Sequence, residues 1–189
     1  MRSIAIVAAL AALTAACGED AAAPSAPVAP PAQVNTPTPA PLPSRVVAAL
    51  DPEGVRVVNG ETGSTRLLAF GAPAAQMRDA VALTRSGQAG ATGTNSECGA
   101  GALDYAQWPE LTLWFQNDAF VGWSANQPGA STLTGIGVGA TRVQLERDYR
   151  IQTEETSLGT QFSAGDLHGV IDDGGVVSAL WAGTSCNFG

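Results

Sequence analysis

The chain has 189 residues and a formal net charge of −8 at pH 7, and its nine basic residues are all arginine. An acidic chain without a basic patch is unsuited to binding nucleic acid or anionic lipid headgroups. The absence of lysine excludes Schiff-base chemistry, a P-loop lysine and a lysine general base.

The first sixteen residues have the features of a secretory signal peptide. Arg2 supplies a positive start, and the apolar run over residues 4–13 is shorter than the roughly 20 residues that cross a bilayer. The sequence Thr14-Ala15-Ala16-Cys17 resembles the lipobox of bacterial lipoproteins, in which cleavage precedes a cysteine that carries the lipid. An ordinary signal peptide with an incidental Cys17 is the alternative.

This resemblance implies export and attachment to the membrane through lipid on Cys17. In this family an Asp after the cysteine retains the protein in the inner membrane, and here that position is Gly18. The resemblance therefore implies an outer-membrane location facing the periplasm. Residues 17–43 are rich in Pro and Ala, which favours an extended, disordered linker of about 3 Å per residue. Residues 44–189 have the length of one domain.

An internal repeat organises this domain. The segments FGAPAAQMRDAV (70–81) and VGATRVQLERDY (138–149) match at a constant offset of 68 residues. Downstream, the stretch 111–125 resembles 167–182. Each half is predicted to consist of a glycine turn, a short helix, a loop and a β-hairpin. We place the first repeat at about 54–126 and the second at about 132–189.

Local patterns support these elements. Thr141 and Gln144 have the spacing of a capping box, and Pro73 suits the first turn of the other helix. Alternating apolar residues over 111–116 indicate a strand, and the turn residues Asp172-Asp173-Gly174-Gly175 indicate a hairpin. A further hairpin is predicted over 54–70.

These elements predict an α+β domain made of two tandem helix-plus-antiparallel-hairpin units. The layout resembles the tandem repeat of the β-lactamase inhibitor protein and the single unit of the small outer-membrane assembly lipoproteins (SmpA/OmlA type). The shared pattern, Gly-x-(Thr/Pro)-x-x-x-(Gln/Glu)-hydrophobic, begins at Gly71 and Gly139. It implies a similar fold over about residues 65–182 and does not by itself imply a function.

Two cysteines lie in the domain, Cys98 and Cys186. Paired thiols are usual in an exported domain, so we expect a disulfide that closes 88 residue steps and contributes about 4–5 kcal/mol. The alternative is a thiol enzyme in which either cysteine acts with His168, the only histidine, as base. One His and two Cys do not have the spacing of a zinc site, so we expect no metal.

A glycine-rich stretch, GIGVGAT (135–141), precedes the second helix but lacks the G-x-G-x-x-G dinucleotide fingerprint. The residues therefore do not support a dehydrogenase, and we expect no cofactor.

Aromatic residues on the predicted strands give the one indication of function. Trp114 alternates with Leu113 and Phe115, so we expect it, with Trp123 and Tyr105, to form an exposed contact surface. The sequence favours a binding or structural role without catalysis, with another envelope protein as partner. A small-ligand or glycan binding module and the thiol enzyme remain alternatives.

Overall fold

The computed structural model describes residues 46–157 and 159–186. The expected signal peptide, Cys17 and the linker lie outside these residues. Within them the chain forms eleven strands and two helices. In chain order the strands are β1 (Val46–Asp51), β2 (Gly54–Asn59), β3 (Thr65–Ala69), β4 (Ala91–Asn95), β5 (Leu103–Trp108), β6 (Leu111–Gln116), β7 (Ala119–Ala125), β8 (Gln152–Thr156), β9 (Gly159–Ala164), β10 (Leu167–Ile171) and β11 (Val177–Gly183). Helix α1 (Ala74–Leu83) precedes β4, and α2 (Arg142–Asp148) precedes β8.

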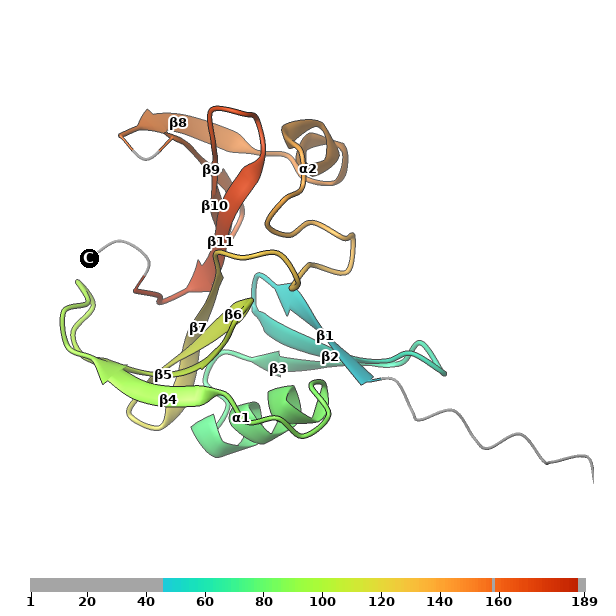
Figure 1. Cartoon of the computed structure of the whole chain (residues 1–189), viewed down its shortest axis with the longest axis vertical. Coiled ribbons are helices and arrows are strands. Elements are labelled where there is room, and N and C mark those ends of the chain that lie inside the picture. Colours follow the sequence, from blue (N-terminus) through green and yellow to red (C-terminus); the bar gives the residue numbers. More distant parts are fainter. Residues whose placement is uncertain (1–45, 158, 187–189) are drawn as a thin grey trace, which may run out of the picture. The chain divides into compact units, whose positions relative to one another are not determined.

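The main element is an eight-stranded antiparallel sheet with the order β4-β5-β6-β7-β11-β10-β9-β8 (Figure 1). It consists of two four-stranded meanders, β4–β7 and β8–β11. The last strands of the two meanders join them, because β11 pairs with β7 through Leu180↔Ala125 and Trp181↔Ser124. Strands β1, β2 and β3 form a separate three-stranded sheet.

The prediction of an α+β fold built from helix-plus-hairpin units is therefore wrong. The domain is mostly antiparallel β-sheet, and each helix is followed by four strands. The segments ATGTN (β4) and QTEET (β8) contain no apolar alternation, so the sequence pattern predicts a loop after each helix where the structure has a strand. Both are edge strands, and neither buries the side chains of either of its faces. They are held by backbone pairing with a single neighbouring strand, and such pairing leaves no hydrophobic pattern in the sequence.

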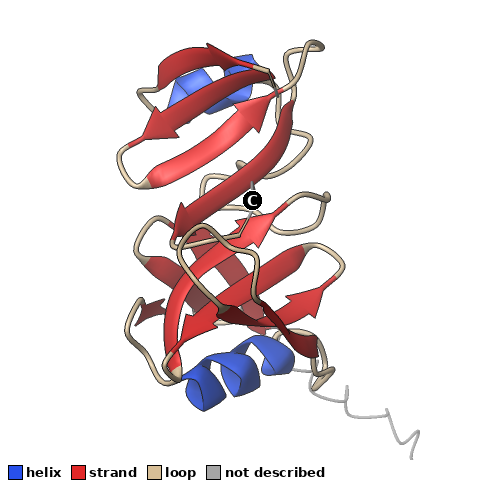
Figure 2. Cartoon of the chain, turned by 90° about the vertical axis from the view of Figure 1, so that its left-hand side faces the viewer, coloured by secondary structure: helices blue, strands red, loops and turns tan. Residues whose placement is uncertain are grey.

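The core lies on one face of the large sheet, where α1, α2 and the small sheet cover it (Figure 1). Fully buried side chains from the strands include Phe115, Phe120 and Trp123. The Trp123 Nε1 donates to the backbone oxygen of Asp51 at 2.8 Å, which ties the large sheet to β1. Figure 2 shows the same strands after a turn of 90° about the vertical axis, so that the left-hand side of Figure 1 faces the viewer.

The two helices are short and begin as the sequence predicts. Pro73 stands at the N-cap of α1, which buries Ala74, Met77 and Val81 along one stripe. At α2 the Thr141 hydroxyl accepts from the Gln144 N–H at 3.3 Å, and the Gln144 side chain accepts from the Thr141 N–H at 2.8 Å. The predicted capping box is therefore confirmed.

Candidate functional site: the open face of the large sheet

The second face of the eight-stranded sheet is called the open face below. One row of cross-strand partners runs along it, with one side chain from each of seven adjacent strands: Gln152, Ser163, His168, Trp181, Ser124, Thr112 and Gln107. Successive side chains of a strand point to opposite sides, and the neighbours Phe162, Leu167, Leu180, Trp123 and Leu113 are all buried in the core. The row therefore faces away from the core and is mostly polar.

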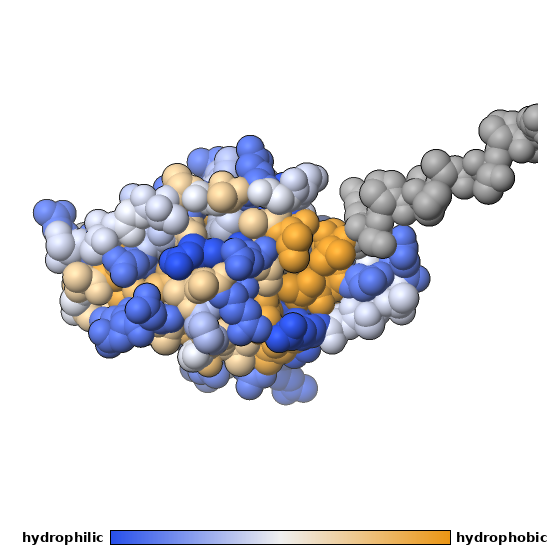
Figure 3. All heavy atoms as spheres, turned by 90° about the horizontal axis from the view of Figure 1, so that it is seen from below, coloured by the Kyte–Doolittle hydropathy of each residue, from blue (hydrophilic) through white to orange (hydrophobic). Residues whose placement is uncertain are grey.

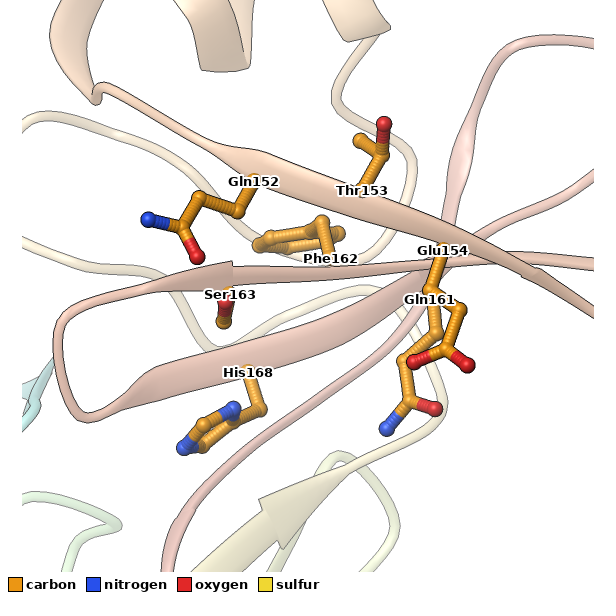
Figure 4. A pocket seen from close by; sticks show the side chains of 7 residues that line it. All are labelled: Gln152, Thr153, Glu154, Gln161, Phe162, Ser163 and His168. Carbon is orange, nitrogen blue, oxygen red and sulfur yellow. The ribbon is translucent and has the colours of Figure 1, made fainter.

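A hollow of about 320 Å³ lies at the β8–β10 end of the open face. Figure 4 shows Gln152, Ser163 and His168 aligned across three strands, with Glu154 and Gln161 in the next row. The amide, hydroxyl and imidazole groups can both donate and accept hydrogen bonds, and Glu154 adds one carboxylate.

The imidazole of His168 is held by its cross-strand neighbour. It stacks on the Trp181 ring with centroids 6.1 Å apart and an angle of 21° between the planes. Trp181 is only 9 % exposed, while His168 is half-buried, so the indole supports the imidazole from below. The imidazole is therefore the ring that lies at the surface, and it covers the face of the indole on which it stacks.

A second hollow, of about 290 Å³, lies at the other end of the open face. Tyr105, Gln107, Thr112 and Cys186 line it together with Trp114. The Trp114 Nε1 donates to the Ser124 Oγ at 2.9 Å, so the indole nitrogen is satisfied inside the sheet. The two hollows lie along the same cross-strand row, with Trp181 between them.

Cys98 and Cys186 form the predicted disulfide, with their Cα atoms 5.3 Å apart. The bond fixes the chain after β11 to the loop between β4 and β5, and it packs beside Leu103 and Trp114. Both sulfur atoms are used in this bond, so the thiol-enzyme alternative has no nucleophile in this form of the protein. His168 lines the hollow at the β8–β10 end, whereas Cys186 lines the one beside β5 and β6.

The expectation of exposed tryptophans is wrong. Trp114 does lie on the open side, but the disulfide and the edge of the Tyr105 ring cover it and leave 7 % exposed. Trp123 is fully buried in the core. A register shift between β6 and β7 changes the phase of β7, so that Phe120 and Trp123, three residues apart, are both buried in the core. Tyr105 is half-buried.

The sequence interpretation missed most of the residues that form this face. The sequence pattern predicts a loop over the stretch that forms β8 and β9, so it gives no indication that Gln152, Gln161 and Ser163 share a surface. It indicates His168 only as a possible catalytic base. The segments LHGVI and GTQFSA have no regular polar alternation that would indicate a shared surface, and only the register of three strands brings the side chains together.

A different surface is apolar. Val46, Val57, Leu68, Ala80 and Leu83 line a hollow of about 380 Å³ between the small sheet and α1, and Leu83 is 70 % exposed. Figure 3 shows an apolar area on this side of the molecule. No residue of the predicted site lies there.

The described residues contain no cluster of three or more His, Cys, Asp or Glu side chains that could hold a metal ion. They also contain no helix with the length and apolar character that crossing a bilayer requires.

At the surface of α2, a hydrogen bond from Arg147 holds the pKa of the Asp148 carboxyl below its usual range. That pair belongs to the covering layer and not to the open face.

Comparison of the chain with family models, with curated proteins and with solved structures gave no match.

Proposed function

We propose that this protein is an exported envelope lipoprotein, anchored in the outer membrane through Cys17, that binds another envelope protein through the open face. The anchor rests on the resemblance of residues 14–17 to the lipobox. The binding role rests on one observation: the main core, both helices and the small sheet lie on one side of the sheet, while the other side, apart from the small cluster at the disulfide, carries a mostly polar row with a hollow at each end.

The dimensions of the face favour a protein as the bound molecule. The eight strands of the sheet are separated by seven spacings of about 4.8 Å, which gives a width near 34 Å. A round patch of about 800 Å², the area that a protein partner typically covers, has a similar diameter of about 32 Å. The row offers amide and hydroxyl groups such as Gln107, Thr112 and Ser163, which can bond a partner's backbone. Buried Trp181 and Trp114 keep the surface rigid, which lowers the entropy lost on binding.

A small neutral ligand is the second candidate. The hollow at Gln152, Ser163 and His168 has a volume of about 320 Å³, and four amide or hydroxyl side chains line it together with the imidazole, Phe162 and a single carboxylate. Such a set suits hydroxyl-rich molecules such as glycans. This hollow occupies only one end of the row. A small ligand bound there would leave the second hollow, and the strands between the two hollows, without a role in binding.

Photo-crosslinking in living cells distinguishes the two. A photoreactive amino acid replaces Ser163 at one end of the open face or Gln107 at the other, in the full chain in its own envelope. Asp79, exposed on α1, is the matched control position on the covered side. We expect the same protein adduct from both open-face positions and none from position 79. Adducts only from position 79, or no protein adduct from either open-face position, would contradict the proposal.

A further inference from the structure

Charge is distributed unevenly between the two layers of the domain. Residues 91–125 and 152–183, which form the eight strands and their hairpins, are called the acidic sheet below. They contain nine carboxylates and no arginine, which is a formal charge of −9: Glu97, Asp104, Glu110, Asp118, Glu154, Glu155, Asp166, Asp172 and Asp173. All of these except the partly buried Glu110 are exposed.

The described arginines of the domain lie in the covering layer. Residues 46–90 and 126–151 contain seven arginines against six carboxylates, so this layer is nearly neutral. Arg56 on β2 pairs with Asp51, and Arg142 pairs with Glu146 on α2. Among the described residues, only Arg85 reaches a carboxylate of the acidic sheet, Glu110, at 2.5 Å. The other eight carboxylates of the acidic sheet form no ion pair with a described arginine.

Two of these carboxylates lie at the open face. Glu154 projects from β8 into the hollow beside Gln161 and His168 (Figure 4). Asp166, in the turn between β9 and β10, lines an adjoining hollow with His168 and Gly183, and the other residues that line this hollow are Pro52, Glu53, Ala69 and Phe70 of the small sheet and its turns. No described residue of the eight strands supplies a compensating Lys or Arg. The field over this face is therefore negative, and it attracts cations within roughly 8 Å at physiological salt.

We infer that the open face binds a cationic protein segment, a loop or peptide rich in Lys or Arg, with Glu154 and Asp166 as its principal ionic contacts. This inference rests on the proposed binding role of the open face. A second copy docking through the same face would bring two surfaces of the same negative sign together, and an anionic envelope polymer would meet the same repulsion, so charge disfavours both of these occupants.

Because the chain has no lysine, chemical crosslinking to a lysine peptide can test the inference without crosslinks between lysines and carboxylates of the chain itself. A carbodiimide joins lysine amines to carboxylates, and this chain has no lysine side chain of its own to react. The full, membrane-extracted protein is treated with carbodiimide and a hexalysine peptide. We expect peptide adducts at Glu154 and Asp166 to exceed those at Asp79 and Glu146 on the helices. Equal labelling of the two sets would overturn the inference.

Affinity gives the second measurement. Fluorescence anisotropy of labelled hexalysine compares the Glu154→Gln/Asp166→Asn variant with the charge-matched control Asp79→Asn/Glu146→Gln. We expect three- to tenfold weaker binding for the first variant, as two solvent-exposed ion pairs are lost, and no such loss for the control. Equal affinities of the two variants, or equally tight binding of labelled hexaglutamine, would contradict the inference.

The crosslinking in cells separates this inference from the proposed function. A partner captured from positions 163 and 107 whose linked segment carries Lys or Arg supports both. A captured segment without Lys or Arg overturns the cationic inference and leaves the proposed function in place. Absence of any adduct removes the proposed function, whereas the peptide measurements test the charge preference of the face independently.

Discussion

The disulfide between Cys98 and Cys186 provides the largest single stabilisation that can be worked out from this structure. The bond closes a loop with a sequence separation of 88. In the chain-entropy model, a loop of that length lowers the entropy of the unfolded chain enough to contribute about 4.6 kcal/mol at 25 °C. A domain of this size has a total stability of about 5–15 kcal/mol, so the bond accounts for a third or more.

We therefore expect reduction with a phosphine to lower the free energy of unfolding by about 3–5 kcal/mol and Tm by about 10–15 °C. Urea unfolding of the oxidised and the reduced protein measures the loss in free energy. The double substitution Cys98→Ala/Cys186→Ala provides a second sample without the cross-link. Reduced wild type keeps both sulfur atoms, so it separates the cross-link from the packing against Trp114. A change in Tm below about 2 °C in both samples would refute the reasoning.

Three substitutions test other parts of the fold. Trp123→Ala should cost about 3–5 kcal/mol in urea unfolding, because Trp123 is fully buried and bonds the Asp51 carbonyl; a loss below about 1 kcal/mol would place the indole outside the core. Thr141→Ala should cost about 1 kcal/mol by removing the cap of α2, whereas Thr141→Ser should restore most of it. Gly169→Ala should destabilise by about 1–3 kcal/mol, because a Cβ there would lie 2.5 Å from the Ala179 carbonyl oxygen and from the Phe162 ring. The control Gly99→Ala, where a Cβ meets nothing within 4 Å, should change stability little, and equal losses at both glycines would contradict the packing described.

The sequence predicted features that depend on neighbouring residues. The cap at Thr141 and the helix start at Pro73 are local signals, and the structure has both. The hairpin predicted over 54–70 is formed by β2 and β3. The disulfide was predicted because two cysteines in an exported domain leave one pairing.

Features that depend on strand pairing could not be read from the sequence. Strand β4 has no apolar alternation, because it lies at an edge and packs no side chain row into the core. The bulge between β6 and β7 reversed the expected side of Trp123, and bulges leave no reliable sequence signal. The polar row on the open face exists only through the register of seven strands, so no single segment indicates it.

The proposed function requires that the domain is exported and anchored through Cys17, and the structure of the domain includes the disulfide between Cys98 and Cys186. The most direct test is the intact mass of the membrane-extracted protein, measured with alkylation before and after reduction. We predict a chain that begins at Cys17 and carries added lipid, with no alkylated thiol before reduction and two after it. An unlipidated chain, or two thiols that react before reduction, would contradict the account.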